Sequence, residues 1–449
     1  MRSSNFLVLL FILTPFSPSI PLFTIAGREV NVGVSTLLIA LIAVLALFNG
    51  IELRMVKEPA TLTIVFLAFW TFLTILGAAR HAGASVIVNS LVVWLRWVQY
   101  IVVFCLIVYG VGKKDYLSKI VRTLFFLGLI FAAWGIYETL FPSDFAAQHL
   151  RGAVTFTMPF FREHDFFDVI DLRTGFYAGS ANYNVAGLFS AMAVVTIIPF
   201  LFKSYGAYTI VRSFSLSVAA TILSIAGVFV TNSRSAFLSL IAGILVLNLI
   251  KTSILRVVLT ISLLISGGIF LVFFLPEWGF TRLLLSTVNY LPAAVPIVLA
   301  APVFHEAMGF DGNVFGAAMR FVAVAEAFSV FMRSPLVGVG FFSFSHHSPL
   351  GTAENFFAQM LAETGIVGFA LLMVFLFQIW QYTKTEFHRE SFAHKYQIGF
   401  RGAFVAGIVA NLAGGFFYDQ RIWGLFLVLS AIMIRLAREE CVHKMTRKR

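Results

Sequence analysis

The chain contains 449 residues, of which 59% are hydrophobic and only 12% are charged. A soluble fold needs more polar residues than this to cover its core, so the composition excludes a soluble globular protein and predicts a polytopic, all-α membrane protein. The net charge of +11 lies mostly in short loops and in the tail 435–449. That placement favours membrane topology and attraction to anionic membrane lipids over nucleic-acid binding. From two cysteines, no disulfide framework or metal cluster is expected.

Twelve hydrophobic runs are candidates for membrane-spanning helices, which need about 20 mostly apolar residues each. In chain order they are 6–25, 32–51, 60–79, 91–110, 120–141, 184–202, 208–230, 235–250, 255–275, 356–380, 398–416 and 422–437. The first run contains Pro15, Pro18 and Pro21, but no Ala-x-Ala cleavage site follows it, so an uncleaved span is favoured over a signal peptide. Because no soluble segment is long enough to fold alone, we expect one membrane domain over residues 1–449.

The positive charges orient these spans. If the spans alternate across the membrane, one set of loops holds all ten lysines and 21 of the 32 Lys and Arg residues. Loops rich in Lys and Arg stay in the cytoplasm during insertion. Both termini and the loop 384–401 are therefore predicted to be cytoplasmic. The long connections 142–183 and 276–355 are predicted to lie on the outer face, the second one with short helices.

The first long outer connection contains Asp165, Asp168 and Asp171. Their spacing matches no strict Ca²⁺ loop and arginines flank them, so no metal site is expected there. Asn184 stands at the head of the sixth predicted span. Its amide suits either a hydrogen bond to a sugar hydroxyl or a helix cap.

The segment 231–235 begins the eighth predicted span. Asn232 or Ser233 can cap this helix, and Arg234 sits at its positive N-terminal end. A guanidinium and free backbone N–H groups then converge on one spot, which predicts an anion site. The alternative is an arginine that reaches lipid headgroups.

In the second long connection, the apolar stretch 283–304 holds three prolines and is predicted to be re-entrant or to lie on the surface. A short helix is expected over 317–332. It carries Arg320, which suits either a phosphate group or an ion pair with Glu326 or Glu306. The glycines of the following turn, 335–340, suit positive φ or close backbone approach.

Candidate polar residues then gather before and within the tenth predicted span. Asn355, Gln359 and Glu363 are spaced i, i+4 and i+8, which predicts one polar stripe along that helix. An ionisable residue within a span, here Glu363, indicates either function or a hydrogen bond between helices. His346 and His347 lie just upstream and are suited to accept a hydroxyl proton, although loop histidines are common.

Three segments resemble motifs of the O-antigen ligase and O-antigen polymerase superfamily. They are Thr231–Phe237, Arg320–Gly340 and Asn355–Gly368, and the resemblance extends from the sixth predicted span to the eleventh. It implies a glycosyltransferase on the periplasmic face of a bacterial inner membrane. Members of the family transfer a glycan from an undecaprenyl diphosphate carrier to an acceptor glycan or to lipid A core, without a nucleotide or metal cofactor.

The resemblance also implies roles for individual residues. Arg234 and Arg320 would hold the diphosphate, and a histidine near the end of the loop would help to activate the acceptor. The sequence departs from the ligase pattern at one point, because Glu354 precedes Asn355 where ligases commonly have a histidine. Either Glu354 is the base, or a loop histidine folds back, or the acceptor is bound differently, and the departure favours a polymerase over a ligase.

A transporter, including a lipid-linked sugar flippase, is the alternative from another class. Twelve spans with both ends inside are common among carriers, whose sites lie near the middle of the bilayer. Here the candidate polar residues lie at the outer ends of the predicted spans, which favours the enzyme.

Overall fold

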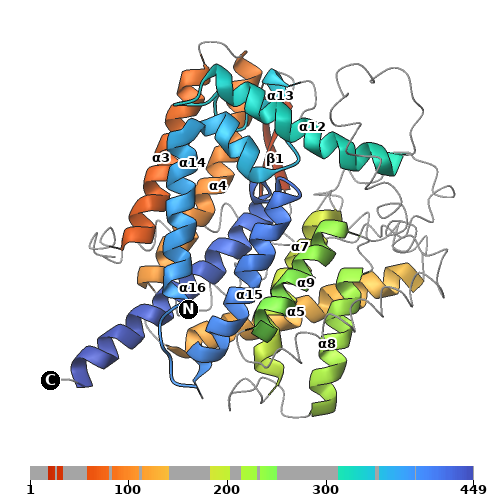
Figure 1. Cartoon of the computed structure of the whole chain (residues 1–449), viewed down its shortest axis with the longest axis vertical. Helices are drawn as coiled ribbons and strands as arrows, with labels where there is room; N and C mark the ends of the chain where they lie inside the picture. The colour runs from red at the N-terminus through yellow and green to blue at the C-terminus, as the bar shows by residue number, and fades with distance from the viewer. Residues whose placement is uncertain are drawn as a thin grey trace.

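The structure is a computed structural model that describes residues 19–25, 28–33, 58–79, 83–110, 114–140, 183–202, 214–229, 233–249, 312–348, 353–389 and 391–447. Most of its helices run side by side as a bundle, and helix α12 (Gly312–Arg333) crosses one end of that bundle (Figure 1). The elements are β1 (Ser19–Ile25), β2 (Arg28–Gly33), α3 (Pro59–Ala78), α4 (Ala84–Gly110), α5 (Lys114–Leu140), α7 (Tyr183–Leu201), α8 (Phe214–Phe229), α9 (Arg234–Leu249), α12 (Gly312–Arg333), α13 (Phe344–His347), α14 (Phe356–Tyr382), α15 (Phe392–Leu412), the short 3₁₀ helix η5 (Phe416–Tyr418) and α16 (Gln420–Arg447).

These helices coincide with the predicted spans wherever a span from residue 58 onward is described. Within the described residues, α3, the segment Val86–Tyr109 of α4, and α14 are long and apolar enough to cross a membrane, and parts of α7, α8 and α9 form shorter apolar helices. The chain therefore has the character of a multi-pass helical membrane protein. The predictions for 32–51, 255–275, 283–304 and the connection 142–182 fall almost entirely outside the described residues.

The prediction of a helical first span is wrong for its last residues. Ser19–Ile25 forms strand β1, which pairs antiparallel with β2 and has an irregular register between Pro21 and Phe23. Hydrophobicity alone does not separate a strand from a helix. Proline at position 21 lacks the N–H that a helix interior needs, and the neighbouring β-branched and aromatic residues favour strands.

A second correction concerns the loop 384–401. Ser391 caps α15 by accepting a hydrogen bond from His394 N–H, so the helix already begins at Phe392 and includes Lys395 and Arg401. Lys395 Nζ donates to the Phe202 carbonyl at 3.0 Å, and the Arg401 guanidinium donates to the carbonyl of Thr383. The two cations therefore satisfy carbonyls at the C-terminal ends of α7 and α14, where helices leave acceptors unpaired.

Small residues let α7, α9 and α15 pack closely. A Cβ added at Gly399 of α15 would lie 2.3 Å from the Thr196 carbonyl oxygen of α7. One added at Gly243 of α9 would lie 2.7 Å from the Val195 side chain. Close approach through glycine is a common way to pack helices in membranes, where burial of apolar surface contributes little.

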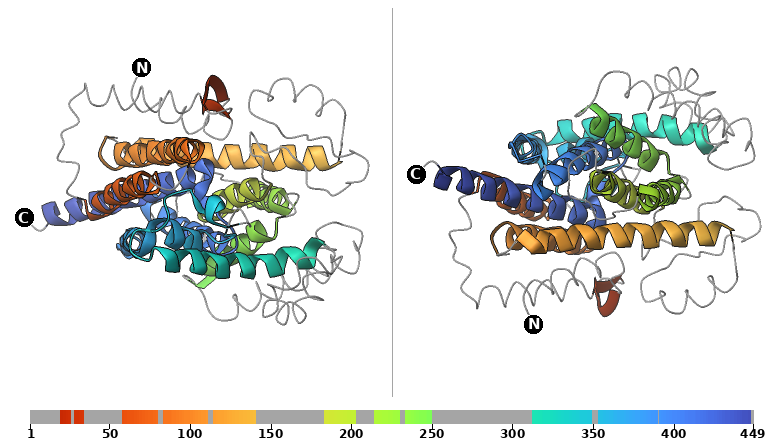
Figure 2. Two further views of the ribbon diagram at one scale, coloured as in Figure 1. Left: turned by 90° about the horizontal axis from the view of Figure 1, so that it is seen from above. Right: turned by 90° about the horizontal axis from the view of Figure 1, so that it is seen from below.

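Aromatic rings join α4 to α16. Trp97 and Trp423 stack with centroids 4.3 Å apart, and the Trp97 indole donates to the Phe417 carbonyl at 3.0 Å. This hydrogen bond fixes η5, the turn that carries Tyr418. Seen along the bundle, α12 and α5 lie on opposite sides of it (Figure 2).

The candidate site lies where α12 crosses the bundle, which we call the α12 end. Here α14 begins and α15 ends, since the Asn355 side-chain amide donates to the Leu412 carbonyl at 2.9 Å and Phe356 N–H donates to the Gly414 carbonyl at 3.2 Å. Lys395 and Phe202 meet at the opposite end of α15.

Candidate functional site

The loop 334–343 lies against α14 at a break in that helix. Gly365 has φ 66° and ψ −173°, which interrupts the helical hydrogen bonds. Three backbone hydrogen bonds join the loop to the break: Val339 N–H to Ala362 C=O at 3.1 Å, Gly340 N–H to Glu363 C=O at 2.9 Å, and Ile366 N–H to Pro335 C=O at 2.9 Å. The next carbonyl, of Thr364, accepts from the Trp70 indole at 2.9 Å. Broken backbone within a membrane helix requires such partners.

Glycine is required on both sides of this contact. Gly338 has φ 78°, and a Cβ there would lie 2.3 Å from the Glu363 carbonyl. A Cβ at Gly365 would lie 2.3 Å from the Leu336 carbonyl oxygen. The expectation that the glycines of 335–340 allow positive φ and close approach is thus confirmed. Two of the three segments that resemble family motifs, Arg320–Gly340 and Asn355–Gly368, therefore form one structural unit.

The carboxylate of Glu363 is fully buried beside this break and accepts four hydrogen bonds. They come from Phe342 N–H at 2.8 Å, Phe344 N–H at 3.2 Å, the Gln359 amide at 3.0 Å and the Tyr418 hydroxyl at 2.7 Å. We call these groups the Glu363 network. Burial and the adjacent carboxylate raise the pKa of Tyr418 well above its usual range, so its hydroxyl keeps its proton and donates.

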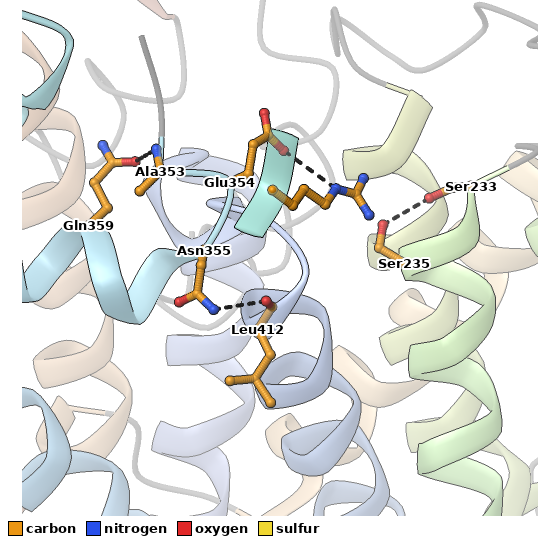
Figure 3. A network of polar contacts seen from close by, with 8 residues as sticks. Ser233, Ser235, Ala353, Glu354, Asn355, Gln359 and Leu412 are labelled. Carbon is orange, nitrogen blue, oxygen red and sulfur yellow. Dashed lines mark hydrogen bonds and ion pairs between the residues drawn. The ribbon is translucent and has the colours of Figure 1, made fainter. Parts of the chain in front are cut away.

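The predicted polar stripe of α14 is present, and it reaches the residues before the helix. Gln359 donates to Glu363 and accepts from Ala353 N–H at 3.3 Å. Asn355 caps α14 by accepting from Ala358 N–H at 3.0 Å, and its side-chain amide donates to the Leu412 carbonyl (Figure 3). The backbone on either side of Glu354 is therefore held by α14 itself.

Arg320 and Glu354 face each other at the α12 end. The predicted helix around Arg320 is α12, and Arg320 Nε lies 3.9 Å from Glu354 Oε2. The two side chains are 41% and 48% exposed, so this ion pair contributes little to stability and leaves both groups accessible. Glu354 has φ 50°, an uncommon conformation for a non-glycine residue.

His346 and His347 lie on the one-turn helix α13, which follows the loop 334–343. Phe344 anchors this turn, because its side chain is fully buried in a cluster with residues of α12 and with Ala353. His346 is exposed and His347 is partly buried. The histidines and Glu354 are thus carried by two segments that pack on the same apolar cluster.

The start of α9 lies at the same end. Ser233 is the cap, since its hydroxyl accepts from Ala236 N–H at 3.2 Å, and Arg234 is the first helical residue. Figure 3 shows Ser233 and Ser235 across from Glu354 and above the end of α15. The side chains of Arg234 and of Asn184, the second residue of α7, lie outside the described part of the structure.

Asp419 and Arg421, which follow η5, form a second ion pair. Arg421 binds Asp419 through two side-chain hydrogen bonds, of 3.0 and 2.7 Å. Burial would raise the pKa of Asp419, but the charge and hydrogen bonds of Arg421 outweigh burial and lower it. Arg96 of α4 interacts electrostatically with the same carboxylate.

Tyr418 and Trp70 support the site, and neither is predicted from the sequence. Tyr418 reaches Glu363 across 55 positions of the chain, and Trp70 reaches Thr364 across 294. A buried carboxylate in an apolar helix requires hydrogen-bond donors from other segments. That requirement indicates that such donors exist, but the sequence does not show which residues they are.

The profile of the protein family described as O-Antigen ligase matches residues 219–373. The match begins inside α8 and ends inside α14, so it is shorter than the resemblance expected from the sixth span to the eleventh. It still contains all three segments noted in the sequence, the start of α9 and the whole Arg320 to Glu363 region. Among curated proteins, none matches this chain.

Proposed function

We propose that this chain, which carries an O-antigen ligase family domain in residues 219–373, is a glycosyltransferase that uses an undecaprenyl diphosphate-linked glycan. The family supports membrane glycan transfer of the ligase or polymerase type. The observation that carries the residue assignment is the Arg320–Glu354 pair, accessible at the α12 end beside the start of α9. The pair supports the assignment of Arg320 as a phosphate-binding cation and of Glu354 as a base.

The reaction assigned to this site is a substitution at the anomeric carbon. The acceptor hydroxyl oxygen forms the new glycosidic bond, the bond from the anomeric carbon to the phosphate oxygen breaks, and undecaprenyl diphosphate leaves. Arg320 and Arg234 stabilise the charge that develops on the leaving group. Glu354, or a histidine of α13, takes the hydroxyl proton. The diphosphate linkage supplies the energy, so no nucleotide is needed.

Within this chemistry we favour polymerisation of surface polysaccharide repeat units. Glu354 stands before Asn355 where ligases commonly have histidine, and Arg320 lies 3.9 Å from this carboxylate. The site would face the periplasm of a bacterial inner membrane, with both termini in the cytoplasm. Transfer to lipid A core is the second candidate.

The polysaccharide of a deletion strain separates these reactions. A lost polymerase leaves single repeat units on lipid A core, whereas a lost ligase leaves bare core and long chains on the carrier. Loss of all periplasmic carrier-linked glycan would instead indicate a flippase and contradict the enzyme.

The diphosphate assignment is tested in the complemented strain. Arg320→Ala and Arg234→Ala should each lower long-chain glycan at least about 100-fold at unchanged protein level, because each removes a cation from the leaving group. Arg333→Ala is the matched control, since Arg333 is an exposed arginine at the far end of the same helix. Normal glycan in the Arg320 and Arg234 variants would reject the assignment.

A further inference from the structure

We propose that Glu363 is the positioning residue of this site. Its buried carboxylate holds in place the two segments that carry the candidate bases, α13 and the segment of Glu354. The inference rests on the proposed function for its consequence in catalysis. It does not depend on which of the three candidate bases accepts the proton.

One arm of the Glu363 network holds α13. The N–H groups of Phe342 and Phe344 both point to this carboxylate, at 2.8 and 3.2 Å, immediately before His346. Phe342 has φ 59°, a backbone conformation that costs energy in a non-glycine residue and needs outside support. The carboxylate supplies that support, so it fixes where the one-turn helix starts.

The other arm holds the segment of Glu354. The Gln359 amide donates to Glu363 and, with its oxygen, accepts from Ala353 N–H. Because Gln359 must present its NH₂ group to the carboxylate, its oxygen is aimed at Ala353. The backbone before Glu354 is therefore oriented from the same carboxylate.

The network specifies a carboxylate and no other group. Each oxygen of Glu363 accepts two hydrogen bonds, and the backbone N–H groups and the Gln359 NH₂ group can only donate. A glutamine at this position would turn an NH₂ group toward two of these donors. A buried donor without an acceptor destabilises its surroundings, so the two segments would move.

A spin label on α13 tests the positioning directly. In a background without Cys105 and Cys441, a nitroxide is attached at position 345, an exposed residue of α13, and in a second sample at position 329, an exposed residue of α12. In detergent-purified full-length protein, Glu363→Gln and Tyr418→Phe should raise the mobility of the label at 345 and leave the label at 329 unchanged. Tyr418→Phe removes one donor of four, so it keeps the test available should Glu363→Gln fail to fold.

The matched control is Tyr396→Phe. Tyr396 is a fully buried tyrosine whose hydroxyl also donates one hydrogen bond, to the Leu429 carbonyl at 2.8 Å, but it lies in α15 and outside the Glu363 network. We expect this variant to leave both labels unchanged.

The kinetic test uses a lipid-linked glycan donor in vesicles. Misplacement by about 1 Å can lower a rate about 100-fold, so we expect that loss in kcat for Glu363→Gln and about a 10-fold loss for Tyr418→Phe, with the donor KM nearly unchanged. A rise in donor KM at constant kcat would overturn the inference, as would folded variants with an unchanged label at 345. If the wild-type protein transfers no glycan, the proposed function fails, while the label measurement still decides whether Glu363 positions α13.

Discussion

The α7–α9–α15 packing and the α12 end hold the same kind of helix in two different ways. In the first region, glycines bring helix backbones together, with Gly399 against the Thr196 carbonyl. In the second, α14 is broken at Gly365, and hydrogen bonds from a loop, a tryptophan and a buried carboxylate network replace the helical ones. Regular helices can be held together by close packing alone. The unpaired N–H and C=O groups of a broken helix need hydrogen-bond partners from other segments.

The difference indicates where function is carried. Close packing of small residues tolerates no added volume but is indifferent to hydrogen bonding. At the α12 end, by contrast, the groups are held by hydrogen bonds, which require a particular direction and a matching donor or acceptor. A site built there holds Glu354 and α13 more firmly than their exposure indicates.

The largest expected effect comes from one added methyl group at Gly365. Gly365→Ala combines a positive φ with a Cβ only 2.3 Å from the Leu336 carbonyl, and we expect a loss of about 3 kcal/mol in unfolding free energy. Gly399→Ala meets backbone at the same distance without a positive φ, and we expect about 2 kcal/mol. Denaturation of the purified variants in detergent measures both.

Gly77→Ala calibrates this comparison. Among the described residues nothing lies within 4 Å of a Cβ at this helical position, so alanine should stabilise the protein by about 0.5–1 kcal/mol. Equal stability of the Gly365 and Gly399 variants would show that the broken helix adds no strain of its own.

A smaller effect is expected from Thr74→Val in α3. The Thr74 hydroxyl accepts from Phe341 N–H at 3.1 Å, so the isosteric change leaves a buried donor unpaired and should lower the unfolding free energy by about 1–3 kcal/mol. Thr63→Val is the control, because the Thr63 hydroxyl only donates within its own helix. Similar losses in the two variants would show that the hydrogen bond from the loop 334–343 to Thr74 adds nothing to stability at the α12 end.

The smallest effect on stability should come from Glu354→Gln. Its ion pair with Arg320 is long and half-exposed, so we expect less than about 0.5 kcal/mol. Transfer activity should nevertheless fall at least about 100-fold if this carboxylate is the base. His346→Asn and His347→Asn are measured beside it, and full activity in Glu354→Gln with loss in a histidine variant would move the base to α13.

Much of the fold follows from hydrophobic runs. The run 60–79 became α3 at 59–78, and 235–250 became α9 at 234–249, because charges, caps and prolines bound these runs. Regular i, i+4 spacing likewise predicted the stripe from Asn355 to Glu363. Hydrophobicity did not identify β1 as a strand, and Lys395 was assigned to a loop because it lies before the apolar run 398–416.

The partners of the site residues could not be predicted in the same way. The spacing of Glu363 indicates a buried acceptor, but the donors come from Phe342 and Tyr418, 21 and 55 positions away. Which distant segments meet depends on packing of the whole bundle. A pattern on one helix does not contain that information.

The pairing of Gly338 with the Glu363 carbonyl and of Gly365 with that of Leu336 limits how the protein can be recombined. Each glycine leaves space for the backbone of the other segment, so the conformation of each segment depends on the other. A chimaera that exchanges the loop before α14 must therefore exchange 335–348 and 353–366 as one cassette. A junction placed between them at the start of α14 would separate two halves of a single backbone fit.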